Sequence, residues 1–522
     1  MLKNFLKDYN PDLASYLIDG FSQGFSLSNA SYYPNTSVKN LKSCSYNPQI
    51  VTDKLNKEQQ AGRVAGPFSQ VPLPHFVTSP IGLHPKKEPG QFRLIHDSSQ
   101  PSGKSVNDGI ARDKASVKYQ TVEDAVKLIV SAGRGSYLAK SDIKSAFRLI
   151  PIHPSEYHLL GFRWLGQYYY DKCLPMGCSS SCRIFESFST ALHWIVQGRI
   201  CNASVVHVLD DFLFVSPSRA DCQAALSEFK HICYLLGVPL APDKTMGPSQ
   251  ILPFLGITLD TMAMQASLPE DKVIRMMHDT DTLLSQRKLK LKQLQSITGL
   301  LNFACNVIVP ARAFLRSIFD LTVGILKPYY HITISKQVKL DAGVWRTFLT
   351  QYNSKSFLLN YQFKSNQAWH LYTDASTTVG FGAFFGSCWF SGVWHESCSE
   401  LHISILELYP IYLAIELWGH KLKNQCLMFH CDNISVVYII NKFSSKDQVI
   451  MILLRKLVLA CLVNNIYIKA SHVPGAINVT ADMLSRNQVK KARLHRPELA
   501  EEPESIPSHL HLHRLLKDSS SS

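Results

Sequence analysis

The sequence predicts an α+β protein of several domains, and three stretches of the chain carry that prediction. From about residue 71 to 260, short apolar runs typical of strands alternate with amphipathic helical patterns. Residues 261 to about 355 become helical, with apolar positions three and four apart, and a second mixed unit begins near residue 369. A chain of 522 residues is long enough for three or four compact units, each with its own core.

The two ends of the chain differ from these stretches in composition. Residues 1–65 are polar and rich in Asn and Ser, which predicts an irregular or partly ordered leader. Beyond residue 487 the chain is charged, contains Pro and His and ends in SSSS, which predicts a flexible tail. The expected domains are a leader at 1–65, an α+β unit at 66–265, a helical region at 266–360, a second α+β unit at 365–487 and a tail at 488–522.

Composition points to a polyanionic partner. Lys and Arg number 54 against 40 Asp and Glu, a formal charge of +14. No apolar run approaches the roughly 20 residues of a membrane-spanning helix. The 13 cysteines are odd in number and include no C-x-x-C pair, so reduced thiols are expected. These features predict an intracellular protein, cytoplasmic or nuclear, without a membrane partner, and leave its oligomeric state open.

Two groups of metal-ligating residue types have simpler explanations. Cys173, Cys178 and Cys182 lie close together, but no fourth ligand follows at zinc-finger spacing, so small core residues are the better interpretation. The alternating His509, His511 and His513 are expected to be solvated in the tail.

The segment VVHVLDDFLFVS, residues 205–216, places two adjacent aspartates between two strand-like runs. Neighbouring side chains on a strand point to opposite faces, so Asp210 and Asp211 act together only where a hairpin turns. Such a turn presents a carboxylate, most directly Asp210, to a cation such as magnesium. The alternative is an ordinary solvated turn.

Further motifs follow one another in a specific order. Asp142 comes directly after an apolar strand and is followed by Phe147, then LPMG at 174–177, DK at 243–244 and FLG at 254–256. Together with the aspartate pair, this order resembles the palm motifs of reverse transcriptases over residues 70 to about 350. The resemblance implies a right-hand polymerase, with fingers and palm up to residue 265 and a thumb or connection at 266–360.

The resemblance also implies a two-metal site for phosphoryl transfer, held by Asp142, Asp210 and Asp211, with two magnesium ions or, alternatively, manganese. Phe147 would exclude a 2′-hydroxyl. Val208 departs from the Tyr that retroviral enzymes carry two residues before the aspartate pair, which removes a hydroxyl near the primer and no metal ligand.

Other roles are implied by the same resemblance. The residues expected to bind the incoming nucleotide are Lys86, Lys87, Arg93, Phe147, Met176, Gly177 and Lys244. Those expected to contact primer or template are Phe185, Phe254, Leu255, Gly256, Lys288, Lys290 and Lys292. For the two lysines of HPKKEPG the alternative is a solvated loop, and for Phe185 and Phe254 it is core packing. The segment RKLKLK is expected to be either a short strand or a basic loop.

A second set of acidic residues stands at the ends of elements after residue 365. Asp374 ends a strand, Glu407 lies on a helix predicted to be amphipathic, Asp432 ends another strand and Asp482 opens a helix. The segments TDAS, LEL, CDN and ADMLSR together resemble a ribonuclease H domain. The resemblance implies that these four residues hold two magnesium ions and that the RNA strand of an RNA–DNA hybrid is hydrolysed. His472 precedes the loop where cellular enzymes carry a mobile His, and we favour a structural role for it.

Within the polymerases that also carry a nuclease, the helical region and the second unit look most like DIRS-type retroelements. The expected function is DNA synthesis from RNA and DNA templates coupled to RNA cleavage, with RNA template, DNA primer, RNA–DNA hybrid and deoxynucleoside triphosphates as partners. The alternative is a catalytically silent nucleic-acid-binding subunit or domesticated relic. An RNA-dependent RNA polymerase is disfavoured by Phe147 and by the nuclease-like unit.

Overall fold

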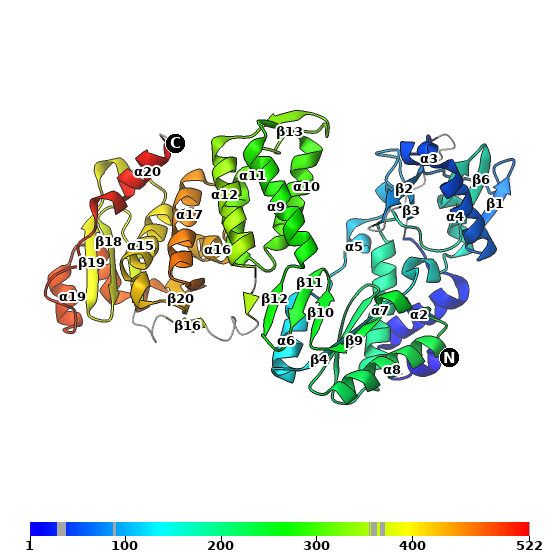
Figure 1. Cartoon of the computed structure of the whole chain (residues 1–522), viewed down its shortest axis with the longest axis horizontal. Helices are drawn as coiled ribbons and strands as arrows, with labels where there is room; N and C mark the ends of the chain where they lie inside the picture. Colours follow the sequence, from blue (N-terminus) through cyan, green and yellow to red (C-terminus); the bar gives the residue numbers. More distant parts are fainter. Residues whose placement is uncertain (29–37, 87–89, 354, 357–362, 366–370, 521–522) are drawn as a thin grey trace. The chain divides into compact units, whose positions relative to one another are not determined.

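The computed structural model describes residues 1–28, 38–86, 90–353, 355–356, 363–365 and 371–520 (Figure 1). Two compact units result: Met1–Leu255 with Leu259–Ala263, and Gly256–Thr258 with Met264–Ser522. Among the described residues, none of the helices has the length and apolar character needed to cross a membrane.

A four-stranded sheet forms the centre of the first unit. Its strands run in the order β7 (Ser204–Val208), β8 (Asp211–Ser216), β4 (Tyr137–Asp142) and β9 (Met246–Ser249). Helices α6 (Val122–Ala132), α7 (Ser181–Gln197) and α8 (Arg219–Leu235) pack against these strands. The apolar run FLFV of β8 is buried along its whole length, and Phe212 and Phe214 both contact Phe229 of α8. This core supports the ends of β4 and β8, where the predicted carboxylates lie.

Smaller sheets build the rest of the first unit. Strands β1 (Val64–Phe68), β6 (Gln167–Asp171) and β5 (Gly161–Trp164) form one sheet, and β2 (Ile81–Pro85) and β3 (Phe92–His96) form a hairpin. The remaining elements are η1 (Asn107–Gly109), α5 (Arg112–Ala115), η2 (Ala146–Leu149), η3 (Pro154–Leu159), η4 (Pro242–Lys244) and β10 (Ile251–Phe254). The residues of β11 (Ile257–Asp260) are divided between the two units.

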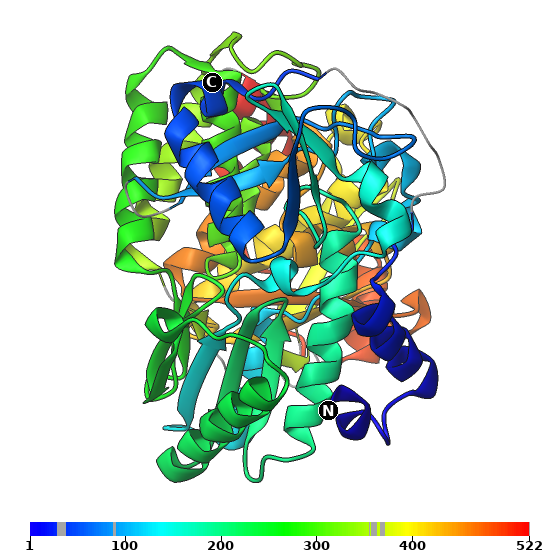
Figure 2. The ribbon, with the colours of Figure 1, turned by 90° about the vertical axis from the view of Figure 1, so that its right-hand side faces the viewer.

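The prediction of an irregular leader is wrong for the described part of residues 1–65. These residues form α1 (Leu2–Phe5), α2 (Pro11–Gln23), α3 (Lys42–Tyr46) and α4 (Pro48–Gln60). Helix α2 begins with a proline, and the Asn10 side chain accepts a hydrogen bond from the Leu13 N–H. Phe21 packs edge to face on Phe188 of α7, and Figure 2 shows this dark blue segment beside that helix. The leader is ordered because its apolar residues complete the core of the first unit.

The second unit begins with a helical region. It contains β12 (Gln265–Ser267), α9 (Glu270–Ser285), β13 (Lys288–Lys290), α10 (Leu291–Ala304), η5 (Val309–Phe314), α11 (Arg316–Asp320), β14 (His331–Thr333), α12 (Lys336–Gln351) and β15 (Lys355–Ser356). The segment RKLKLK therefore includes a strand, β13, which pairs antiparallel with β14. Leu289 is buried between two exposed lysines, as alternation in a strand requires.

The same unit continues with mixed strands and helices. Strands β19 (Cys388–Val393), β18 (Gly380–Phe385) and β17 (Leu371–Ala375) form an antiparallel sheet, and β16 (Phe363–Ser365), β20 (Cys426–Cys431) and β21 (Tyr467–His472) form a parallel one. The other elements are η6 (Glu396–Cys398), α15 (Ile403–Trp418), η7 (Gly419–Lys421), α16 (Ile434–Lys442), α17 (Gln448–Val463), η8 (Gly475–Ile477) and α18 (Val479–Ser485). Helix α15 packs on β17, β18 and α17, and it is buried nearly all round. The amphipathic helix that the sequence predicted here is therefore a core helix.

The prediction of a flexible tail is also wrong for the described residues up to 520. They form α19 (Val489–His495), η9 (Ser508–Leu510) and α20 (Leu512–Ser520). Leu499, Leu510 and Leu515 are buried, and the Trp389 indole N–H donates to the Ala500 carbonyl at 2.8 Å. Leu510 and Leu512, which alternate with histidine in the sequence, are both buried and help to anchor this segment.

The helical region and the mixed region that follows it form one compact unit, whereas the sequence predicted separate domains. A buried ion pair joins them: Arg455 of α17 contacts Asp341 of α12 at 2.9 Å. Ser317 also donates to the same carboxylate, at 2.5 Å. The separation of the two regions was predicted from a change in sequence pattern, which does not reveal buried contacts between them.

Candidate active sites

Three aspartates meet at the end of the four-stranded sheet in the first unit. Strands β4 and β8 run antiparallel, and Asp142, the last residue of β4, is paired with Asp211, the first residue of β8. Asp210 lies in the turn between β7 and β8, and its carbonyl accepts a hydrogen bond from the Ile143 N–H at 3.0 Å. The predicted hairpin is present, and it brings together the three carboxylates that the sequence singled out.

The turn itself has an unusual backbone. Leu209 has a φ of +53°, which is uncommon for a residue with a branched side chain. Its N–H donates to the buried carboxylate of Glu186 on α7 at 3.1 Å. Glu186 is a residue that the sequence reasoning missed. The only signal was a charged residue within the apolar run IFESF.

Electrostatic repulsion accumulates among these carboxylates. Burial and the neighbouring Asp142 raise the pKa of Asp210. Burial, Asp210 and Asp142 raise the pKa of Asp211 to about 6. The Lys244 ammonium lies 2.9 Å from Asp142 Oδ2. Lys244, Arg93 and Lys140 lower the pKa values of Asp210 or Asp211 but do not cancel the rise, so the donor set suits hard divalent cations such as magnesium.

Several predicted nucleotide-binding residues lie on surfaces of the same unit. Phe147, in η2, is partly exposed and packs edge to face on Phe185 with ring centroids 5.7 Å apart. Arg93 is exposed on β3 and lowers the pKa of Asp210, which indicates that its charge acts on the carboxylates. Lys86 is exposed after β2, whereas Lys87 lies outside the described residues.

The segment LPMG is held by the backbone of β3. The His96 N–H donates to the Met176 carbonyl at 3.0 Å. Gly177 has a φ of +131°, and a Cβ there would collide with the His96 carbonyl oxygen. Asn107 donates to the Gly177 carbonyl at 2.9 Å. Glycine is therefore required at this position by the packing of the chain on itself, and the role of Gly177 in binding a nucleotide stays a prediction.

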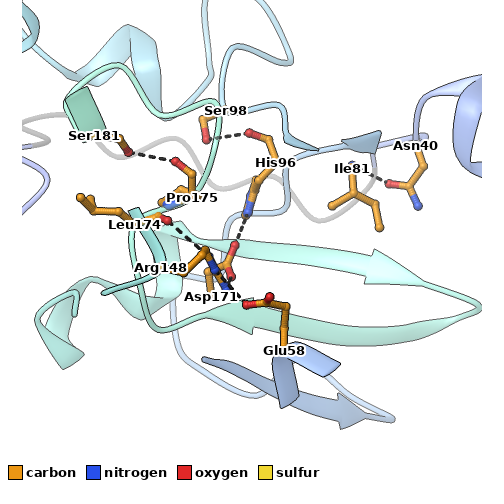
Figure 3. Close-up of polar contacts among 10 residues, drawn as sticks. All are labelled: Asn40, Glu58, Ile81, His96, Ser98, Arg148, Asp171, Leu174, Pro175 and Ser181. Atoms are coloured by element: carbon orange, nitrogen blue, oxygen red, sulfur yellow. Dashed lines mark hydrogen bonds and ion pairs between the residues drawn. The ribbon is translucent and has the colours of Figure 1, made fainter. Parts of the chain in front are cut away.

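A buried ionic network lies beneath this segment (Figure 3). Arg148, which follows Phe147, contacts Asp171 at 2.6 Å and Glu58 of α4 at 3.0 Å, and it donates to the Leu174 carbonyl. His96 Nδ1 lies 3.0 Å from the other oxygen of Asp171. Although burial acts to raise the pKa of Asp171, Arg148 and His96 hold it below its usual value. The leader thus supplies one acid of the network that carries the LPMG segment.

Of the residues predicted to contact primer or template, some are buried and others are exposed. Phe185 is fully buried and Phe254 is 2% exposed, so both side chains serve the core and are not available to a primer in this structure. Their alternative interpretation, core packing, is the one the structure supports. Leu255 and Gly256 form a turn with φ values of +48° and +77°. In the second unit, Lys288, Lys290 and Lys292 are exposed on and beside β13.

The four acids of the second unit come from four elements. Asp374 lies on β17, Glu407 on α15, Asp432 directly after β20 and Asp482 on α18. A Cβ at Gly382 of β18 would collide with Leu484, so the glycine allows α18 to lie close against the sheet. The Ser485 hydroxyl donates to Asp374 Oδ2 at 2.6 Å and ties α18 to β17. The convergence predicted from element ends is present in the structure.

These acids also raise one another's pKa. Burial raises the pKa of Asp374 to about 6 against the opposing Ser485 hydrogen bond, and Asp432 and Asp482 add to the rise. Burial, Asp374 and Asp432 raise the pKa of Glu407 to about 9. Arg486 pairs with Asp482 at 2.8 Å. Such a cluster of poorly compensated carboxylates fits a divalent cation.

His472 and Cys431 lie at the ends of β21 and β20, near this site. His472 is exposed at the end of β21, paired with Cys431 in the strand register. Cys431 is buried beside Glu407 and Asp432, and the sequence reasoning gave it no role. The signal available for Cys431 was its place immediately before Asp432 in CDN.

The cysteine group at 173–182 lies in the first unit. Cys178 is buried, consistent with a core role, and Cys173 and Cys182 are partly buried.

Comparison with known proteins gives a family for part of the chain. Residues 84–259 match the model described as reverse transcriptase (RNA-dependent DNA polymerase). The Gag-Pro-Pol polyprotein of Mason-Pfizer monkey virus is 22% identical over 325 residues, which cover 58% of this chain and 16% of the polyprotein. The Pro-Pol polyprotein of feline foamy virus is 27% identical over 274 residues, covering 49% and 20%. The chain thus matches a fifth or less of the length of these relatives.

Solved structures share the fold. A foamy viral protease-reverse transcriptase dRH in complex with double-stranded DNA aligns with a TM-score of 0.52 at 15% identity, covering 91% of this chain and 82% of that one. A foamy viral protease-reverse transcriptase in complex with an RNA/DNA hybrid aligns with a TM-score of 0.50 at 14% identity, covering 97% and 64%. The predicted class, a mixed multidomain protein with a right-hand polymerase fold, is confirmed.

Proposed function

We propose that this chain, which carries a reverse transcriptase domain at residues 84–259, synthesises DNA on RNA and DNA templates and cleaves the RNA strand of RNA–DNA hybrids. The observation that carries the polymerase proposal is the meeting of Asp142, Asp210 and Asp211 at the end of one sheet within the matched domain. The four converging acids of the second unit support the nuclease proposal.

In the polymerase, Asp142, Asp210 and Asp211 would hold two magnesium ions, with manganese as the alternative. Bound there, the ions would lower the pKa of the primer 3′-hydroxyl and stabilise charge on the transferred phosphoryl group. Lys244, which lies 2.9 Å from Asp142 Oδ2, would stabilise the negative charge of the leaving pyrophosphate. Arg93 offers its guanidinium to the triphosphate, and Phe147 packs beneath the sugar and excludes a 2′-hydroxyl.

In the nuclease, Asp374, Glu407, Asp432 and Asp482 would hold two magnesium ions, which when bound would activate the attacking water. The raised pKa values of Asp374 and Glu407 mean that cation binding displaces protons from these acids. Exposed lysines on and beside β13 and the net charge of +14 supply attraction for nucleic-acid phosphates.

The finer assignment is a DIRS-type retroelement enzyme acting inside the cell, in the cytoplasm or the nucleus. Its partners would be an RNA template, a DNA primer, an RNA–DNA hybrid and deoxynucleoside triphosphates. The segments KQLQSITGLLNFACNVI and SHVPGAINVTADMLSR support the subgroup.

Primer extension on an RNA template tests the polymerase. The wild-type chain should extend a DNA primer with magnesium and deoxynucleotides, and Asp210→Asn should reduce extension by a factor of at least about 10³, the order expected when a group acting only in the transition state is lost. Asp12→Asn, on the exposed face of α2, is the matched control. A wild-type chain that binds the duplex without extending it would instead support a silent binding subunit.

A hybrid labelled on both strands tests the nuclease. Cleavage should be confined to the RNA strand and lost in Asp432→Asn. Asp210→Asn should cleave normally while failing to polymerise, and Asp432→Asn should polymerise normally, so each variant is the control for the other. Unchanged cleavage by Asp432→Asn would refute the proposed nuclease site.

A further inference from the structure

The nuclease site contains a sulfur atom among its oxygens. One ligand atom each from Glu407, Cys431 and Asp432 lies within 4.8 Å of the others. Across the described residues, this is the single group of three or more His, Cys, Asp or Glu side chains that meets this spacing. It unites α15 with the end of β20.

Cys431 is placed to face the acids. It is the last residue of β20 and is 6% exposed, and its Sγ accepts a hydrogen bond from the Asn433 N–H at 3.4 Å. Sulfur is a poor ligand for magnesium, which prefers oxygen, so Cys431 does not compete with the carboxylates for that ion.

Thiophilic cations reverse this preference. Zinc and cadmium bind thiolate sulfur and accept carboxylate oxygen as well. We propose that Glu407, Cys431 and Asp432 form a site for thiophilic divalent cations, and that occupation of this site blocks the nuclease. On binding, the Cys431 S–H bond breaks, a sulfur–metal bond forms and the proton passes to solvent, with no change of oxidation state.

The two candidate sites of the chain then differ in metal selectivity. The predicted ligands of the polymerase site, Asp142, Asp210 and Asp211, offer oxygen alone, whereas the nuclease site offers sulfur beside oxygen. Zinc or cadmium at low concentration therefore stops RNA cleavage before it stops DNA synthesis. The blocking of cleavage rests on the proposed function, and the binding of the cation does not.

Cadmium titration of the full chain tests the binding directly. Cadmium–thiolate bonds give an ultraviolet charge-transfer absorption that oxygen ligands lack. Cys201 is the one exposed cysteine of the 13, so all variants carry Cys201→Ser to lower the background. In that background, Cys431→Ser should lose the tightest-binding part of the absorption. Cys426→Ser, a buried cysteine at the other end of β20, is the matched control and should keep it.

Enzyme assays complete the test. Cadmium affinity and cadmium inhibition of hybrid cleavage should both weaken by about tenfold or more in Cys431→Ser, because a direct ligand should matter at least as much as an outer-shell partner. If Cys431→Ser does not fold, as judged by circular dichroism, Cys431→Ala and Cys431→Thr take its place. Equal absorption in wild type and the Cys431 variants overturns the proposal. Absence of hybrid cleavage by wild type, with the absorption still dependent on Cys431, refutes the nuclease function and leaves the cation site standing.

Discussion

The carboxylate of Glu186 accepts a hydrogen bond of 3.1 Å from the backbone N–H of Leu209, the residue that precedes Asp210 and Asp211. Its other oxygen lies 3.4 Å from His207 Nε2, and His207 Nδ1 lies 2.9 Å from His193 Nδ1. Burial and then His207 lower the pKa of His193 to about 4, so that ring is neutral at pH 7. Helix α7 thus holds the positive-φ turn of the aspartate hairpin through a buried polar chain.

Glu186→Leu should lower the polymerase kcat by about tenfold to a hundredfold. A hydrogen bond to a charged group contributes about 1.5–3 kcal/mol, and its loss frees the turn that carries Asp210. Glu186→Gln keeps an acceptor oxygen and should retain most activity. Steady-state primer extension gives kcat and KM, and the duplex dissociation constant should be unchanged in both variants. A kcat equal to wild type in Glu186→Leu would show that the turn holds without this bond.

Glu407→Gln should stabilise the metal-free protein at pH 8 and not at pH 5. The folded pKa of Glu407 is about 9 and the ordinary value is 4.5, so the folded state retains a proton that the unfolded state releases. The stability from this group is complete below pH 4.5 and is lost as pH rises towards 9. Between pH 5 and 8 the wild type should lose about 2–4 kcal/mol that the variant does not lose. Denaturant unfolding in EDTA measures the free energy of unfolding of both proteins at each pH. If the free energy of unfolding changed with pH equally in the two proteins, the raised pKa of Glu407 would be contradicted.

Ser485→Ala should shift the pH profile of hybrid cleavage to higher pH. The Ser485 hydroxyl donates to Asp374 at 2.6 Å and lowers its pKa, so its removal raises that pKa above about 6 and makes cation binding require higher pH. Ser485→Thr retains the hydroxyl and should keep the wild-type profile. Cleavage rates at limiting magnesium between pH 5.5 and 9 provide the measurement, with primer extension by the same proteins as the control.

Arg148→Met should destabilise the first unit by about 3–5 kcal/mol, because it removes the guanidinium that contacts the buried Asp171 and leaves Glu58 with Arg63 alone. Arg199→Met is the matched control, since Arg199 is half exposed and lies 3.7 Å from Glu228, and it should change stability by less than about 1 kcal/mol. Denaturant unfolding followed by tryptophan fluorescence compares the two. Equal effects would show that the network of Figure 3 contributes no more than a surface pair.

Local sequence patterns predicted the structure best where acidic residues lie at the ends of apolar, strand-like runs. The pair Asp210 and Asp211 between two apolar runs predicted a hairpin, and Asp142 after another apolar run predicted a second strand that supplies a carboxylate. The alternation of Lys and Leu in RKLKLK predicted β13 as one of two outcomes, because successive side chains of a strand point to opposite faces. At both ends of the chain, polar composition led to wrong predictions of irregular or flexible structure. A few leucines and aromatic residues are enough to pack these segments against larger cores.

The sequence by itself determined the fold class, since periodicity depends on neighbouring residues, and the resemblance of its motifs to reverse transcriptases and ribonuclease H predicted the seven acidic residues and their division between two sites. Only the tertiary structure decided that Glu186 holds the Leu209 turn, that Glu58 of the leader pairs with Arg148, and that Cys431 faces Glu407. Each joins residues 23 to 90 positions apart, and such contacts depend on how elements pack. Burial strengthens the hydrogen bonds and ion pairs of these groups, and it arises only when the cores form.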